Sequence, residues 1–455
     1  QIDTRNRLAD APNGAKWELL RPSTEEEIMS KSSEKKKLGI IVSGGPAPGI
    51  NGVIHSATIE AVNRGYDVLG FYDGFSHLME GELVATPLTI DDVSRIYLKG
   101  GSILRTSRAN PTKEEDSLKL CSEVLMEANI GYLLVIGGDD TAYAAYRVAR
   151  YAQEYMDADI QVAHAPKTID NDLPLPEEIN TFGFETAREV GTQITMSLME
   201  EALTGFRWFV VVTMGRKTGH LALGIGKSSG ATITLIPEEW EGRTIRMQEV
   251  VDILVTSILK RMADNKPYGV ALVSEGVMEH MSHQDLRELE YVERDAFGNV
   301  HLSEINFSDI LKHELDSELE QLGVPIRVTS KDLGYELRCT DPVAFDIDYT
   351  RSLGEAAVAF LLDGGTNATV TIQGTRVVPI PFDEMMDQET GRTEVRKVSL
   401  DSFIYRSARK LMIRLKSEDG QDEDLIVRMA DHTKLSLNEF KTRFGYLLGT
   451  APRPF

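Results

Sequence analysis

With 455 residues and a mass of 50.5 kDa, the chain is long enough for two or three domains, and its 42% hydrophobic content is ordinary for a globular protein. A formal net charge of −22 argues against a nucleic-acid or anionic-membrane partner, since both require clustered positive potential. Two cysteines without CxxC spacing argue against a disulfide framework and a zinc site. No apolar run is long enough for a membrane span, and residues 1–37 lack the apolar segment of a secretory signal. We therefore expect a cytoplasmic protein with an N-terminal extension.

From residue 38 onward, apolar runs that suit buried strands alternate with amphipathic stretches. We predict helices at about 51–64 and 141–154, and strands at 38–43, 67–71, 131–136, 161–165, 208–213, 232–236 and 269–274. This alternation is typical of the α/β class, in which helices wrap parallel sheets. The expected fold has two Rossmann-like three-layer α/β/α lobes with the active site in the cleft between them.

The order of these elements also predicts how the chain divides. Residues 38–181 form the first lobe, residues 182–337 form the second, and about 338–395 return to the first. Residues 396–455 form a helical C-terminal segment. Its apolar residues have helical spacing and are expected to pack into the core: Phe403, Ile404, Ala408, Leu411, Met412 and Leu415.

In doubly wound sheets, the loops at the carboxyl ends of the strands line the crevice that binds ligands. The first such loop, residues 43–51, contains Gly44, Gly45 and Gly49 and precedes a helix. Its glycines would let backbone N–H groups approach an anion at the helix N-terminus. A βα turn can also be rich in glycine for steric reasons, so this loop alone leaves both interpretations open.

The second loop, residues 137–141, places two adjacent carboxylates, Asp139 and Asp140, at the start of a helix. One aspartate would be enough to cap the helix. A second one in a loop shaped for close backbone approach indicates a magnesium ligand, because Mg²⁺ combines carboxylate oxygen with water and substrate phosphate.

The third loop, residues 166–174, contains Lys167, Thr168, Asp170 and Asp172. A turn requires only one or two such residues. Phosphoryl transfer to a sugar hydroxyl requires a base, a metal bridge and a cation near the transferring group, and this loop can supply several of these.

The fourth loop follows the strand at 208–213 and contains Arg216, with Arg207 just before that strand. A guanidinium at a strand end suits bidentate phosphate binding. A surface salt bridge is the alternative role.

In this order and spacing, the four loops resemble the phosphofructokinase family over about residues 38 to 374, with 99–108, 274–276 and 333–338 as further landmarks. The resemblance implies that the lobe at 38–181 and 338–395 binds the phosphoryl donor with Mg²⁺ on Asp139. It implies that Asp170 takes the proton of the sugar 1-hydroxyl, with Arg216, Lys167 and Asp140 as further catalytic residues. It implies that the lobe at 182–337 binds fructose 6-phosphate. The residues it assigns to this substrate, from both lobes, are Thr168, Asp172, Arg207, Met214, Gly215, Arg216, Glu275, Arg327, Tyr335 and Arg338. It assigns the donor to Gly44, Gly45, Arg108, Gly138 and Lys167.

The resemblance also predicts the assembly. Arg207 matches an arginine that a neighbouring subunit donates to the sugar phosphate site, and Arg327 is a less certain counterpart of a second one. We therefore expect a homodimer or homotetramer with shared sites.

The donor is predicted from two positions, Asp140 and Lys167. Family members that use ATP usually have glycine at the first position, and many have glycine at the second. Both substitutions, and more weakly Tyr335, point to the pyrophosphate-dependent branch. At ~4 Å and an effective dielectric of about 20, repulsion between unit charges is roughly 4 kcal/mol, close to a thousandfold discrimination against a nucleotide α-phosphate. The expected reaction is reversible transfer from pyrophosphate to fructose 6-phosphate, giving fructose 1,6-bisphosphate and phosphate.

Three alternative functions compete with this one. The first is an ATP-dependent phosphofructokinase, because some ATP-using relatives also have lysine at the position of Lys167. A catalytically silent regulatory subunit is less consistent with the retained Asp139, Asp170, Asp172 and Arg216. A dinucleotide-dependent oxidoreductase lacks a clean GxGxxG fingerprint and would leave the third loop unexplained.

Overall fold

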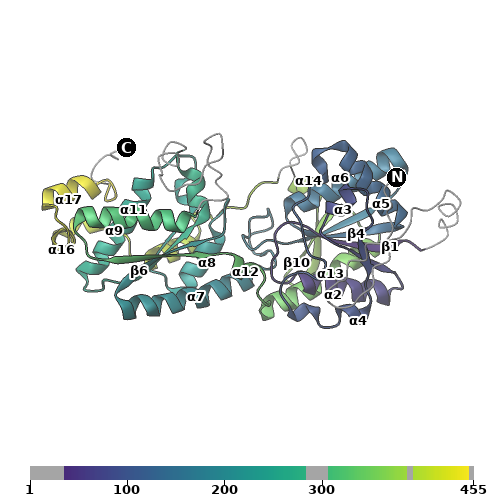
Figure 1. Ribbon diagram of the computed structural model, residues 1–455, viewed down its shortest axis with the longest axis horizontal. Helices are drawn as coiled ribbons and strands as arrows, with labels where there is room; N and C mark the ends of the chain where they lie inside the picture. The colour runs from purple at the N-terminus through teal and green to yellow at the C-terminus, as the bar shows by residue number, and fades with distance from the viewer. Residues whose placement is uncertain (1–34, 283–305, 387–392, 450–455) are drawn as a thin grey trace, which may run out of the picture.

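The computed structural model describes residues 35–282, 306–386 and 393–449. Most of the predicted N-terminal extension and the last residues of the C-terminal segment lie outside the described residues. Two lobes lie side by side along the long axis, each with a sheet at its centre (Figure 1). The predicted α/β class with two lobes is confirmed.

The first lobe contains a seven-stranded sheet with the order β11-β10-β5-β4-β1-β2-β3. The five central strands are parallel, and β3 and β11 are antiparallel edge strands. The central strands are nearly continuous apolar runs, as expected for a parallel sheet that is covered on both faces. The strands are β1 (Lys37–Val42), β2 (Val68–Phe71), β3 (Ala85–Pro87), β4 (Ile130–Gly137), β5 (Gln161–Pro166), β10 (Ala368–Gln373) and β11 (Arg376–Pro381).

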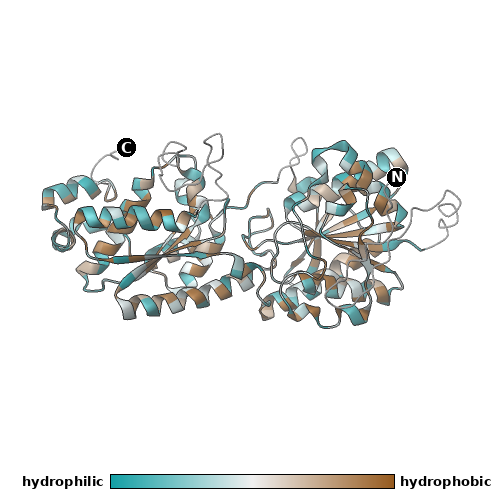
Figure 2. Ribbon diagram, viewed as in Figure 1, coloured by the Kyte–Doolittle hydropathy of each residue, from teal (hydrophilic) through white to brown (hydrophobic). Residues whose placement is uncertain are grey.

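Alternate residues of these strands serve two separate cores. Ile40 packs in the core under α2 (Ile50–Asn63) and α13 (Ala344–Leu362), whereas Ile41 packs in the core under α5 (Glu115–Glu127) and α6 (Asp139–Met156). Brown strands between helices with teal outer faces show the same three layers (Figure 2). The short helices of this lobe are α3 (Ser76–Met79), α4 (Ile90–Val93), η2 (Ile96–Leu98), η3 (Pro111–Lys113) and α14 (Phe382–Met385).

The second lobe contains a four-stranded parallel sheet with the order β7-β8-β6-β9. Its strands are β6 (Arg207–Thr213), β7 (Ile233–Leu235), β8 (Gly269–Ser274) and β9 (Arg327–Leu333). One face packs against α7 (Phe184–Gly205) and α8 (His220–Ser229), and the other against α9 (Met247–Ala263) and α11 (Phe307–Leu322). The short helices here are η4 (Pro237–Trp240), η5 (Glu275–His280) and α12 (Tyr335–Arg338).

The C-terminal segment joins the second lobe. Its helices α16 (Glu423–Asp431) and α17 (Leu437–Phe444) share a core with α9, and α15 (Phe403–Leu411) packs against α8. The 3₁₀ turn η7 (Ser417–Gln421) lies between them in the sequence.

The expected core packing of α15 is wrong for three of its residues. Phe403, Ile404 and Leu411 are 76%, 62% and 68% exposed, and the helix ends before Met412. Tyr405 and Ala408 are the residues that face α8, so the buried stripe is rotated relative to the one counted from apolar letters alone.

Within the described residues, the chain passes between the lobes near Gly183, between β9 and α13, and along residues 393–398. The first two passages are tied together by Asp346. Its carboxylate accepts hydrogen bonds from the Gly183 and Thr186 backbone N–H groups at 2.9 and 2.8 Å, at the start of α7. None of the described helices is long and apolar enough to cross a lipid bilayer.

Candidate active site

The first glycine loop connects β1 to α2 and is held by the neighbouring loop at 99–108. Gly44 has φ 85°, its N–H donates to the Ser107 carbonyl at 2.8 Å, and its carbonyl accepts from Thr106 Oγ1 at 2.7 Å. A side chain on Gly45 would collide with the Arg338 guanidinium. The glycines therefore allow cationic side chains to approach the loop backbone.

The two carboxylates of the second loop begin α6 in different surroundings. Asp139 is half-buried, and its carboxylate accepts from the Asp140 N–H at 2.9 Å and from Thr393 Oγ1 at 2.7 Å. Asp140 keeps contact with solvent, although partial loss of hydration and the nearby Asp139 raise its pKa. Because solvent screens an exposed carboxylate, the discrimination against ATP expected from Asp140 is about tenfold and not roughly thousandfold.

His164 supports this loop from β5. It is fully buried, and its Nε2 lies 2.8 Å from the Gly137 carbonyl while Nδ1 lies 2.9 Å from Thr369 Oγ1. Burial lowers its pKa to about 4, so the ring is neutral, with Nε2–H donating and Nδ1 accepting. Sequence reasoning missed His164 because it reads as one more residue of a buried strand.

Lys167 connects the third loop to the first. It is buried, its ammonium donates to the Gly45 carbonyl, and it lies beside Gly44. Burial lowers its pKa to about 8, with further lowering by Arg338 and Arg108, whereas Asp170 and Asp172 act in the opposite direction. The predicted donor residues Gly44, Gly45, Arg108 and Lys167 are thus brought together.

Asp170 and Asp172 lie on the same loop as neighbouring acids. Burial, followed by the charges of Asp172 and Glu275, raises the pKa of Asp170 to about 7. Burial and Asp139 also raise the pKa of Asp172, which accepts a hydrogen bond from the Thr168 hydroxyl. A carboxyl poised near neutral pH in a partly dry site is suited to act as a general base.

The second lobe contributes loops at the carboxyl ends of β6 and β8. Gly215, with φ 127°, accepts from Ser274 Oγ at 2.8 Å and from the Gly276 N–H at 3.0 Å, so the two loops are fixed to each other. The Arg216 guanidinium lies 3.1 Å from Glu279 and 3.8 Å from Glu275. Met214 packs beside Gly334 at the end of β9.

Charged groups of the second lobe reach the first. Arg338, at the end of α12, lies beside Gly45, with its Nε 3.5 Å from the Pro46 carbonyl, and its charge acts on Asp170. Lys217, which follows Arg216, lowers the pKa of both Asp140 and Asp172. Tyr335 is 79% exposed, and its ring lies 5.6 Å from the Arg338 guanidinium. The sequence pattern did not single out Lys217, because the fourth loop was assigned its phosphate contact through the adjacent Arg216 alone.

Arg207 and Arg327 are not brought to this site within one chain. They are neighbours in register at the amino ends of β6 and β9, whereas Met214 follows the carboxyl end of β6. A seven-residue strand spans roughly 20 Å, so the sheet separates them from the other predicted residues. Glu201 lies 3.6 Å from the Arg207 guanidinium, which is only partly exposed.

The oxygen-rich surroundings of Asp139 fit a magnesium ion held by one carboxylate together with water and phosphate. The charge of Asp139 raises the pKa of both Asp140 and Asp172, in addition to the effect of burial on each. They do not form a compact cage, because among the described residues the only group of three potential ligands within 4.8 Å is His77, Glu80 and Glu82. That group lies elsewhere in the first lobe and was not predicted.

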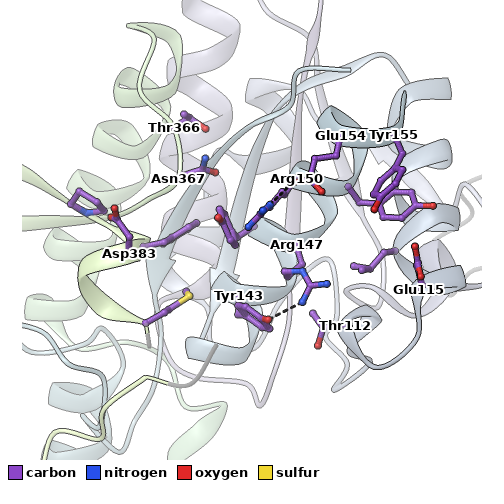
Figure 3. Close-up of a pocket in the computed structure, with 16 residues that line it drawn as sticks. Thr112, Glu115, Tyr143, Arg147, Arg150, Glu154, Tyr155, Thr366, Asn367 and Asp383 are labelled. Carbon is purple, nitrogen blue, oxygen red and sulfur yellow. Dashed lines mark hydrogen bonds and ion pairs between the residues drawn. The ribbon is translucent and has the colours of Figure 1, made fainter. Parts of the chain in front are cut away.

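A cavity of about 930 Å³ is lined by residues of α5, α6 and the end of β11 with α14 (Figure 3). Tyr143 and Arg147 share a 2.8 Å hydrogen bond there, and Arg150 pairs with Glu154. None of the predicted site residues lines it.

The model of one protein family, described as Phosphofructokinase, matches residues 37–361. The chain belongs to the phosphofructokinase family. The pyrophosphate–fructose 6-phosphate 1-phosphotransferase of Naegleria fowleri is 45% identical to the chain over 421 residues, covering 90% of this chain and 95% of that one. The enzyme of the same name from Thermotoga maritima is 47% identical over 415 residues, covering 90% and 98%. The crystal structure of the pyrophosphate-dependent phosphofructokinase of Marinobacter aquaeolei superposes with a TM-score of 0.61 at 17% identity, covering 83% of this chain and 91% of that one. This structural similarity supports the fold.

Proposed function

We propose that the chain is a phosphotransferase that moves a phosphoryl group from pyrophosphate to the 1-hydroxyl of fructose 6-phosphate, reversibly and with Mg²⁺. The observation that carries the proposal is the presence of both Asp140 and Lys167 in the sequence of a phosphofructokinase family member. These are the two positions that distinguish users of pyrophosphate from users of ATP. The names of the two relatives at 45% and 47% identity agree with it.

The residues of the third loop suit this reaction. Asp170, in its ionised form, would accept the proton of the 1-hydroxyl as that oxygen attacks the terminal phosphorus of pyrophosphate. The new bond joins the sugar oxygen to phosphorus, and the bond that breaks joins phosphorus to the bridging oxygen, which leaves with phosphate. Lys167, held at the donor loop, would stabilise the charge that accumulates on this leaving group. The proton then passes from Asp170 to solvent.

Asp139 would hold the metal, with its orientation set by Thr393 and by the Asp140 N–H. A bound Mg²⁺ would neutralise charge on the phosphates and bridge them to the protein. Gly138, over which there is open space, leaves room for the donor beside the helix N-terminus.

The lobe with the four-stranded sheet is proposed to bind the sugar phosphate, and the lobe with the seven-stranded sheet the donor. Met214, Gly215, Glu275 and Arg216 lie on loops that face the third loop, and Arg338 reaches across. Thr168, Asp172 and Tyr335 complete the proposed contacts.

Arg207 and Arg327 would serve the site of a neighbouring subunit. They lie at the amino ends of β6 and β9, whereas Arg216 follows the carboxyl end of β6, and this position supports the assignment. A homodimer or homotetramer with shared sugar phosphate sites is therefore proposed. A cytoplasmic location remains a prediction.

The reverse reaction tests the proposal. With fructose 1,6-bisphosphate, inorganic phosphate and Mg²⁺, the enzyme is expected to form pyrophosphate and fructose 6-phosphate. An ATP-dependent enzyme would require ADP as the acceptor, and a regulatory subunit would form neither product. Product formation with ADP and none with phosphate would overturn the donor assignment.

A further inference from the structure

Residues 393–398, which we call the interlobe segment, run between the two lobes beside the proposed catalytic loops. The segment lies beyond residues 37–361, which match the family model. At one end Thr393 donates to Asp139, and at the other Lys397 pairs with Glu241 at 2.6 Å. Arg396, between them, contacts the third loop with both its backbone and its side chain.

The Arg396 guanidinium is surrounded by acceptors of residues 171–179. Nε donates to the Asn171 carbonyl at 3.1 Å, and Nη2 donates to the Asn171 side-chain oxygen. Nη1 faces three carbonyls, those of Ile179 at 2.7 Å, Pro176 at 3.1 Å and Leu175 at 3.4 Å. The Arg396 N–H also donates to the Asp172 carbonyl at 2.9 Å. One residue thus contacts the loop between its two acids, at Asn171, and at Asp172 and beyond.

Asn171, which accepts two hydrogen bonds from the Arg396 guanidinium, lies between Asp170 and Asp172 in the sequence. It is buried in a left-handed conformation, with φ 58°. Its side-chain oxygen also accepts from the Thr181 N–H at 3.0 Å. Asp170 therefore precedes a residue in a strained backbone conformation, which Arg396, Asn180 and Thr181 hold by hydrogen bonds.

The chemistry of Arg396 differs from that of an ordinary salt bridge. The hydrogen bonds of its guanidinium described here end on carbonyl and amide oxygens, and burial lowers its pKa. Removing a guanidinium from water without a bonded carboxylate is costly, so the site retains it for a geometric reason. A planar fork with five N–H groups can satisfy this arc of oxygens, and a lysine ammonium cannot.

We propose that Arg396 is a positioning residue that holds the third loop, and with it Asp170, in register with the sugar-binding loops of the second lobe. The proposal rests on the base role of Asp170 proposed above.

The other end of the segment supplies that register. The Val398 N–H donates to Glu238 Oε1 at 2.9 Å, and the same carboxylate accepts from Thr218 Oγ1 and the Gly219 N–H, both at 2.9 Å. His220 donates to the Arg396 carbonyl. Thr218, Gly219 and His220 directly follow Arg216 and Lys217 in the sequence. The interlobe segment therefore contacts loops of both lobes.

Three variants of the full-length enzyme test the proposal. Arg396→Lys keeps the charge and loses the fork, Arg396→Ala opens the space, and Lys397→Ala is the matched control on the same segment. Arg396→Lys is expected to lower kcat about 100-fold with KM values for both substrates within about threefold, because a misplacement near 1 Å has this effect. Lys397→Ala is expected to stay within about twofold of wild type, since its ion pair is exposed.

Two readouts distinguish positioning from a general loss of structure. Methylguanidinium is expected to restore part of the kcat of Arg396→Ala, and methylammonium is not. Amide hydrogen exchange is expected to increase in residues 168–180 of Arg396→Lys and to stay at the wild-type level in α9 and α16.

Unchanged kcat in Arg396→Lys would overturn the proposal, as would exchange that increases over the whole chain. Failure of the base role is separable. If Asp170→Asn retained activity while exchange at 168–180 still depended on Arg396, the loop-holding role would stand and the role of Asp170 would be wrong.

Discussion

The loop ends of the two sheets carry charge in different ways. At the seven-stranded sheet, Lys167 is buried and Asp170 is largely removed from water, and both have displaced pKa values. At the four-stranded sheet, Arg216 is about half exposed and pairs with Glu279, and Lys331 pairs with Glu336. Charges that are desolvated and loosely paired suit proton and phosphoryl transfer, whereas solvated, paired charges suit reversible binding of an anion.

This contrast fits the proposal that one lobe carries out the chemistry and the other binds the sugar phosphate. On the proposed assignments, chemistry would take place at the carboxyl ends of β4 and β5, where Lys167 and Asp170 are removed from water. The proposed sugar phosphate contacts would come from the second lobe and, in the proposed oligomer, from a neighbouring subunit. Substitutions at the first edge are therefore expected to change kcat, and those at the second edge to change KM.

The largest effect is expected from Asp170→Asn. Removal of a general base is expected to lower kcat by about 10³ to 10⁴, with binding of fructose 6-phosphate unchanged. Stability is expected to increase, because a carboxyl whose folded-state pKa is raised destabilises the fold at any pH above its unfolded pKa. The midpoint of thermal unfolding at pH 8 should rise by about 2 °C or more.

Kinetics, calorimetric titration with fructose 6-phosphate and thermal unfolding measure these three quantities on one preparation. A loss of sugar binding equal to the loss of kcat would contradict the assignment of Asp170 to chemistry.

Arg207→Ala tests the second edge and the shared site. It is expected to raise KM for fructose 6-phosphate by about tenfold or more, through loss of a charge-assisted phosphate contact. Mixed with Asp170→Asn and reassembled, it should recover activity, because hybrids contain one site with both residues. For a randomly mixed dimer, the recovery is about a quarter of the wild-type activity. No recovery from hybrids that are shown to form would place Arg207 outside the site.

Asp140→Gly sharpens the account of donor choice at the first edge. With ATP as donor, kcat/KM is expected to increase about tenfold, since removing an exposed carboxylate relieves a screened repulsion. Asp140→Asn is the control that removes the charge and keeps the volume. If only glycine admitted ATP, the exclusion would be steric. No gain with either variant would remove Asp140 from donor selection.

The smallest effect is a narrow pH optimum. Asp170 must be ionised, so kcat/KM is expected to fall as the pH falls through about 7. Lys167 must be charged, so activity is expected to fall as the pH rises through about 8. Lys167→Arg should shift the alkaline limb upward and leave the acid limb in place. An acid limb near pH 4 would contradict a desolvated base.

The sequence predicted seven of the described strands and the loops after them, because apolar runs and glycine punctuation are local signals. It did not predict β3, β9, β10 or β11. It also found Lys167 and Asp170, whose residue types were too concentrated for a turn. It could not find His164, Thr393 or Arg396. His164 has the pattern of a buried strand residue. Thr393 and Arg396 reach the site only because the chain passes between the lobes again, and Arg396 is 225 residues from Asn171 in the sequence.

The orientation of α15 was also beyond the sequence pattern. Tyr405 is buried, whereas Phe403 and Ile404, which helical spacing of apolar residues predicted to be buried, are exposed. Tertiary contact with α8 decided this, and periodicity alone did not.

Donor preference is the most direct test of the central claim. With saturating fructose 6-phosphate and Mg²⁺, kcat/KM for pyrophosphate and for ATP are measured on the wild-type enzyme. The account predicts a preference for pyrophosphate of at least about tenfold. Equal use of both donors, or a preference for ATP, would contradict it.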